Sequence, residues 1–229
     1  MPSPDPPERF AVAIDCVVFG LRPASAAPTE LVVLLVPSED ASPAGGLALP
    51  QRHLRTGEAL DDAAKAALAE DVGLKVAYLE QLYTFDDLGD DRRDRAVRVA
   101  YFALVNAIGH EQSRGSWQDV RSAPPLALDQ ARVLEAALAR LRAKVRYRPI
   151  GFGLLPERFS LTHLQRMYEV ILGRTLDKRN FRKKIASLGF VVPTSEKERD
   201  VRRRAAQLFR FDRARYQELT GRGFDLELI

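Results

Sequence analysis

Short apolar runs, separated by polar and Gly- or Pro-rich segments, divide the first 126 residues into strands around one helix. Runs rich in Val, Ile and Phe predict strands over residues 10–20, 31–36, 75–85 and 97–107, with a short extended segment at 47–50. Residues 58–72 have helical apolar spacing, and Gly73 is suited to end that helix. The charged segment 86–94 is expected to be a link. This order predicts a mixed β-sheet with one helix.

The apolar period changes after Pro124 and Pro125, which are expected to close the first unit. Residues 127–145 predict an amphipathic helix, because Leu134, Leu138 and Leu141 fall on one stripe. Its last turn carries Arg and Lys residues, which suits the negative end of the helix dipole.

Residues beyond 150 predict two helices followed by a hairpin. The helices are expected at 159–173, with Ser160 or Thr162 as N-cap, and at 177–188, and Gly173 and Gly189 are suited to end them. The hairpin is expected to have strands at 190–192 and 207–211 with a charged tip at 195–204. Helix, turn, helix and hairpin in this order are typical of a winged helix-turn-helix domain. The whole chain is therefore expected to be α+β.

Charge is distributed unevenly along the 229 residues. Residues 1–149 contain 18 basic and 21 acidic residues, a net charge of −3, whereas residues 150–229 contain 17 and 10, a net charge of +7. A basic module of this kind favours a polyanionic partner, although a solvated basic surface is the alternative. The single cysteine, Cys16, excludes a disulfide within the chain and a thiolate zinc site. The same scarcity of cysteine indicates a reducing, cytoplasmic setting. No apolar run approaches the ~20 residues that span a bilayer, so we expect no membrane contact.

The expected second helix of the basic module places most of its cations opposite its apolar face, as major-groove binding of duplex DNA requires. Asn180 is suited to bidentate adenine readout, unless it only contacts the backbone. Single-stranded RNA readout is disfavoured because this helix carries no outward aromatic side chain. The DNA-binding candidates are Thr162, Lys178, Arg179, Asn180, Arg182 and Lys183, with Arg202, Arg203 and Arg204 at the hairpin tip.

The helix at 58–72 resembles a damaged Nudix box, whose pattern is G-x5-E-x7-R-E-U-x-E-E-x-G-U with U apolar. Aligned on Gly73, the acidic positions are retained by Glu58, Glu70 and Asp71. Ala66 and Ala67 stand where the box has Arg and Glu, and Arg52 replaces its leading Gly.

Because Nudix carboxylates hold Mg²⁺, the loss at position 67 predicts little or no hydrolysis and no cofactor. A weak Mg²⁺ site at Glu70 and Asp71 and a merely solvated acidic helix end both stay open. Arg52 and Arg55 are candidate ligand-binding residues, or ordinary surface arginines.

The segments LLPERFSLTHLQ (154–165) and LDKRNFRKK (176–184) closely resemble the DNA-binding domain of the Nudix-related regulators, the NrtR-like repressors of NAD metabolism. The resemblance implies a homodimeric repressor in which a Nudix-like domain (1–126) senses a nucleotide-like metabolite such as ADP-ribose. A linker helix (127–149) would join it to a winged helix-turn-helix domain (150–229) that leaves operator DNA on ligand binding. The alternative is a Nudix pyrophosphohydrolase of nucleoside-diphosphate derivatives with an accessory DNA-binding domain.

Overall fold

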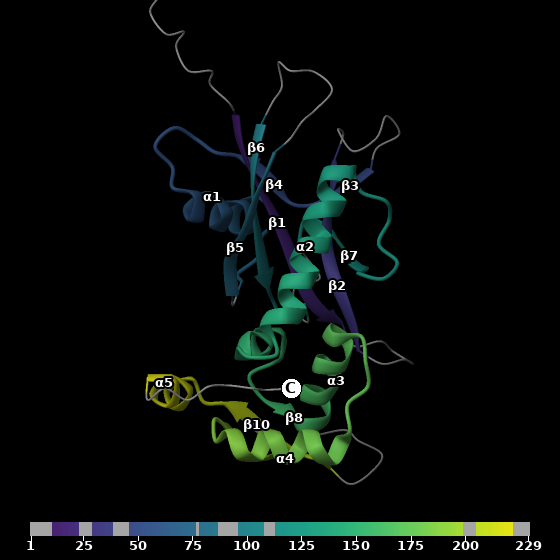
Figure 1. Cartoon of the computed structure of the whole chain (residues 1–229), viewed down its shortest axis with the longest axis vertical. Helices are drawn as coiled ribbons and strands as arrows, with labels where there is room; N and C mark the ends of the chain where they lie inside the picture. The colour runs from purple at the N-terminus through teal and green to yellow at the C-terminus, as the bar shows by residue number, and fades with distance from the viewer. Residues whose placement is uncertain are drawn as a thin grey trace, which may run out of the picture.

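The computed structural model describes residues 11–22, 29–38, 46–76, 78–86, 96–107, 113–198 and 205–221. A mixed sheet forms one end of the molecule, and a smaller helical unit with its own sheet forms the other (Figure 1). In the described part of the chain, no helix is both long and apolar enough to cross a bilayer.

The larger sheet has the strand order β3-β2-β1-β6-β5, with β4 paired to β1 and β7 paired to β2. Its central strands, β1 and β6, are parallel, and the other pairs are antiparallel. The strands are β1 (Ala11–Arg22), β2 (Glu30–Ser38), β3 (Gly46–Ala48), β4 (Gln51–His53), β5 (Tyr78–Asp86), β6 (Ala96–Leu104) and β7 (Ser116–Asp119).

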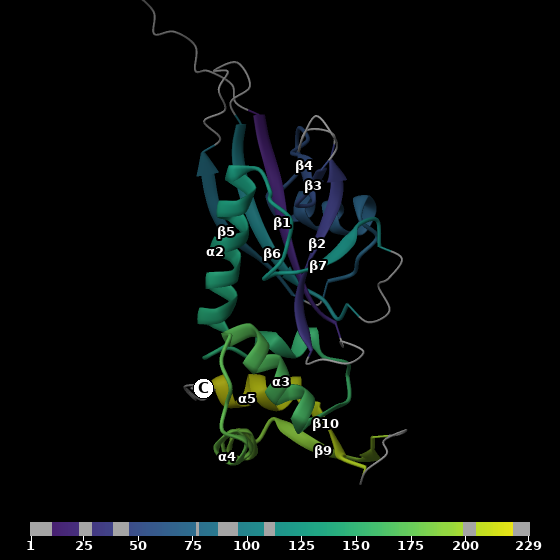
Figure 2. The same cartoon turned by 90° about the vertical axis from the view of Figure 1, so that its right-hand side faces the viewer.

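Helices cover both faces of this sheet (Figures 1 and 2). Alternation along β1 sends Ile14, Cys16 and Val18 to one face, where they pack with α1 (Leu60–Ala66) and the following π-helix η1 (Ala67–Asp71). The other β1 face packs against α2 (Leu128–Lys144). Burial, with a smaller contribution from Asp15, raises the pKa of the Cys16 thiol, so the thiol stays protonated and packs as an apolar group.

The smaller unit contains the expected helix, turn, helix and hairpin. Its sheet has the order β8-β10-β9. Its elements are the 3-10 helix η3 (Pro149–Leu154), β8 (Phe159–Ser160), α3 (Leu161–Leu172), α4 (Lys178–Leu188), β9 (Val191–Lys197), β10 (Gln207–Phe211) and α5 (Arg213–Gly221). Its buried side chains join those on the α2 side of the larger sheet in one cluster.

The structure adjusts several expected boundaries. The helix expected over 58–72 begins at Leu60 and changes to a π-helix at Ala67. The first wing strand extends to Lys197, into the segment expected to be the tip. Ser160, rather than Thr162, caps α3: its hydroxyl accepts from the His163 amide at 3.3 Å. Most of the charged link at 86–94 lies outside the described residues.

Candidate functional site

Helix α4 is fixed at both ends and along one face. The Asp177 carboxylate accepts a hydrogen bond from the Asn180 amide at 2.8 Å, and Gly189 ends the helix with φ of 74°. Phe181, Ile185 and Leu188 are buried, and the Phe181 ring lies 5.8 Å from the Tyr168 ring of α3. The opposite face must therefore point to solvent.

A second set of contacts holds the turn between α3 and α4. One carboxylate oxygen of Glu169 accepts from the Leu176 amide at 2.9 Å and from Gln165 at 3.0 Å. The Gln165 amide also donates to the Leu176 carbonyl. These residues orient α4 relative to α3. Sequence reasoning missed them, because a polar residue on a helix carries no local sign of the turn that it will meet.

The solvent face of α4 is densely cationic. Each of Lys178, Arg179, Asn180, Arg182 and Lys183 is exposed, and none of these five side chains forms an ion pair or hydrogen bond with a described residue. A row of unpaired cations beside an amide side chain can meet phosphates and base edges together.

The other DNA-binding candidates are placed less completely. Thr162 lies half-buried in the first turn of α3. Arg202, Arg203 and Arg204 lie outside the described residues, and so does the rest of the hairpin tip at 199–204.

The residues of the damaged Nudix box meet around one arginine. The Arg52 guanidinium lies 3.4 Å from a carboxylate oxygen of Glu70, 3.8 Å from one of Asp71 and 4.0 Å from one of Glu58. Its side chain is only 8% exposed, against 67% for Glu70. Arg52 thus supplies the positive charge that three converging carboxylates require.

This arrangement does not fit a divalent metal. A guanidinium already lies within 4.0 Å of all three acids, and Ala67, where the box pattern has glutamate, packs in the apolar cluster under β1. Across the described ranges, no group of three or more His, Cys, Asp and Glu side chains is suited to a metal ion.

Arg55 lies at the rim of the same cluster. Its backbone amide donates to the Glu58 carboxylate at 3.0 Å, which fixes the loop before α1. Its side chain is exposed. The sequence places Arg52 and Arg55 near the box but carries no sign that Arg52 pairs with all three acids.

Comparison with known proteins finds a match to the winged helix domain and a match to a longer part of the chain. The family model of the NrtR DNA-binding winged helix domain matches residues 151–211. The ADPR responsive transcriptional repressor NtrR of Acinetobacter baylyi is 36% identical over 151 residues, 63% of this chain and 60% of that protein, so the match spans less than two thirds of the relative.

Solved structures extend the likeness along the chain. Shewanella oneidensis NrtR, solved in complex with a 27mer DNA, is 27% identical with a TM-score of 0.77, covering 90% of this chain and 95% of that one. A MutT/nudix family protein from Enterococcus faecalis, 20% identical with a TM-score of 0.65 over 89% and 88%, shows the fold alone. The family match identifies residues 151–211 as an NrtR DNA-binding winged helix domain, and the whole chain is similar in its two-part architecture to Shewanella oneidensis NrtR.

Proposed function

We propose that this chain is a transcriptional repressor that binds operator DNA and leaves it when its Nudix-like domain binds a nucleotide-like metabolite, ADP-ribose or a related molecule. The unpaired cationic face of α4 carries this proposal, since it leaves five polar or charged side chains open to DNA. The names of the two relatives, an ADPR responsive repressor and an NrtR solved with DNA, support it. We propose that the repressor acts in the cytoplasm as a homodimer. Two copies are needed because one winged helix reads only a half-site.

Each part of the chain has its own proposed role. We assign ligand sensing to residues 1–126, the linker to 127–149 and DNA binding to 150–229. Thr162 and the α4 residues are the proposed DNA contacts, with Arg202, Arg203 and Arg204 proposed for the wing. Arg55, whose side chain is exposed, is better placed than the enclosed Arg52 to reach a ligand phosphate.

A gel shift with promoter fragments, in the presence and absence of ADP-ribose, tests this function. We expect a discrete complex with DNA upstream of the chain's own or neighbouring genes, and its loss as ADP-ribose is added. Binding of equal strength to unrelated DNA of the same length, or a complex that ADP-ribose leaves unchanged, would contradict the proposal.

Asn180 provides a test of sequence readout. Asn180→Ala is expected to relax preference at one base pair by about 1–3 kcal/mol, because the side chain has the paired donor and acceptor that adenine needs. The measurement is the affinity for an operator and for single-base variants of it. A uniform loss on all sequences would make Asn180 a backbone contact.

We further propose that hydrolysis is absent or residual, because Ala67 supplies no carboxylate and Arg52 occupies the centre of the remaining acids. Incubation with ADP-ribose and Mg²⁺ is expected to yield no AMP above the uncatalysed background. Robust turnover would favour the pyrophosphohydrolase alternative.

The role of Arg52 as internal cation has its own test. Arg52→Ala removes the positive charge around which the carboxylates of Glu58, Glu70 and Asp71 converge. Mn²⁺ is therefore expected to raise the melting temperature of this variant and not that of the unaltered chain. Arg55→Ala, which removes a neighbouring arginine whose described contact is through its backbone, is the matched control. A Mn²⁺ shift in the unaltered chain would show that Arg52 does not replace the metal.

A further inference from the structure

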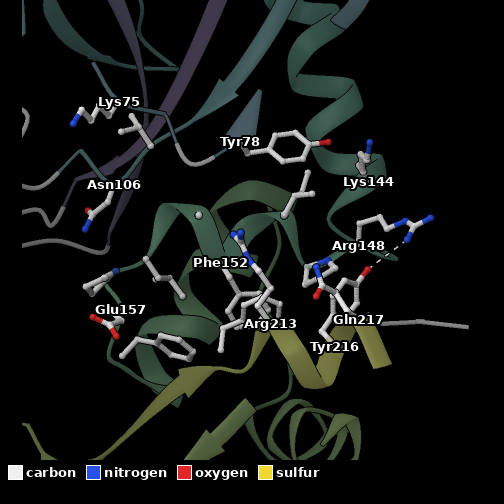
Figure 3. Close-up of a pocket in the computed structure, with 18 residues that line it drawn as sticks. Lys75, Tyr78, Asn106, Lys144, Arg148, Phe152, Glu157, Arg213, Tyr216 and Gln217 are labelled. Atoms are coloured by element: carbon white, nitrogen blue, oxygen red, sulfur yellow. Dashed lines mark hydrogen bonds between the residues drawn. The ribbon is translucent and has the colours of Figure 1, made fainter. Parts of the chain in front are cut away.

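A cavity of about 920 Å³ lies where the two units meet, away from both the α4 face and the Arg52 cluster. Figure 3 shows Lys75, Tyr78 and Asn106 of the larger unit on one side and Arg213, Tyr216 and Gln217 of α5 on the other. Lys144 and Arg148, at and just beyond the end of α2, close it laterally. Its volume lies in the range of small-molecule sites, about 300–1,000 Å³.

The charges around this cavity favour an anion. Four basic side chains and one acidic side chain, Glu157, line it. Lys144 pairs with Glu80, and Arg148 donates to the Tyr216 hydroxyl at 3.4 Å. Lys75 and Arg213 are exposed and form no ion pair with any described residue, so both are available to an incoming phosphate.

Aromatic side chains also line the cavity. The Phe152 and Phe211 rings stack with centroids 4.7 Å apart, and the Tyr216 ring lies 5.8 Å from that of Phe211. Tyr78 lies across the cavity, with the Lys144 ammonium 5.6 Å from its ring centre. A cavity lined by both aromatic side chains and basic side chains suits a ligand that has both a planar ring and phosphate groups.

We propose that this cavity is a second ligand site, for a nucleoside phosphate, separate from the Nudix-box cluster. The ring of the ligand packs among the aromatic side chains, and its phosphates lie between Lys75 and Arg213. Because the two cations belong to different units, the ligand stabilises the arrangement in which both reach it, and so alters DNA binding through the linked domain. That last consequence rests on the proposed repressor function; ligand binding itself does not.

Calorimetric titration of the full chain with ADP, and separately with inorganic pyrophosphate, tests the proposal. Lys75→Ala/Arg213→Ala is expected to weaken ADP binding about tenfold or more, since two charge-assisted contacts are lost. Arg146→Ala is the matched control, because Arg146 is exposed at the same junction but does not line the cavity. Pyrophosphate is expected to bind more weakly than ADP and to be affected by the same double substitution.

Three results would overturn this site: no ADP binding to the unaltered chain, equal ADP affinity in all variants, or loss of ADP binding only in Arg52→Ala or Arg55→Ala. The double variant replaces two exposed side chains, and an unchanged melting temperature shows that its fold is kept. Failure of the chain to bind promoter DNA would contradict the repressor function while leaving the ADP titration interpretable, so the two proposals can fail separately.

Discussion

Replacing Arg179 and Lys183 together by glutamate is expected to weaken operator binding by about 100-fold or more. The two residues are four positions apart, so they lie on the same side of α4. The change removes two cations from the phosphate backbone and places two anions near it, and each lost contact lowers the slope of log affinity against log salt by about one unit. Both side chains are exposed and form no ion pair with a described residue, so the fold should persist.

Fluorescence anisotropy of labelled operator at several salt concentrations measures both effects. Lys65→Glu provides the control, because it makes the same type of charge change on α1, where the side chain is exposed and pairs with Asp62. Unaltered affinity in the double variant, with an unchanged salt slope, would show that α4 does not face DNA and would remove the main support for the proposed function.

The sequence was most informative where one short pattern decided the structure. Both winged-helix helices were predicted within two residues at each end, because their caps are local signals: Gly173 and Gly189 both adopt the left-handed conformation. The apolar run at 10–20 and the apolar stripe over 127–145 likewise predicted the strand β1 and the helix α2. The expected winged helix architecture is confirmed by the family match over residues 151–211.

Elements with weak local patterns were missed. The strand β7 is only four residues long and all half-buried, and it forms because β2 offers it an edge. Helix α5 has no buried residue, so its apolar spacing gives no signal. The cluster around Arg52 forms because β4 and η1 lie close together in the folded chain. The box pattern shows that Arg52 stands where the pattern has glycine, but it does not show that Arg52 pairs with three acids.

The two units are joined through a shared apolar core as well as through the linker helix. Ala137 and Leu141 of α2 belong to the same buried cluster as Val17 and Phe19 of β1 and Met167 of α3. A rearrangement of the sheet can therefore reach the winged helix through packed side chains, which change between discrete arrangements rather than continuously. For the proposed repressor, this continuity gives a physical route by which ligand binding in one unit would alter DNA binding by the other.

A polar contact fixes the start of the same linker helix. Arg98 of β6 lies 3.2 Å from a carboxylate oxygen of Asp15 in β1, and its Nε lies 3.1 Å from Asp129 in the first turn of α2. Asp15 is fully buried. A carboxylate buried in that position requires a cationic partner, which Arg98 supplies.

Arg98→Met is accordingly expected to lower the free energy of unfolding by about 3–5 kcal/mol, because it leaves the Asp15 charge buried without this cation. Arg98→Lys keeps the charge and should lose less. The double variant Asp15→Asn/Arg98→Met removes both charges and should recover part of the loss. Urea unfolding of the unaltered protein, Arg98→Met, Asp15→Asn and this double variant isolates the coupling between the two side chains. If Arg98→Met and the double variant were equally unstable, the loss would come from packing of the arginine stem rather than from its charge, and the link between sheet and linker helix would not be electrostatic.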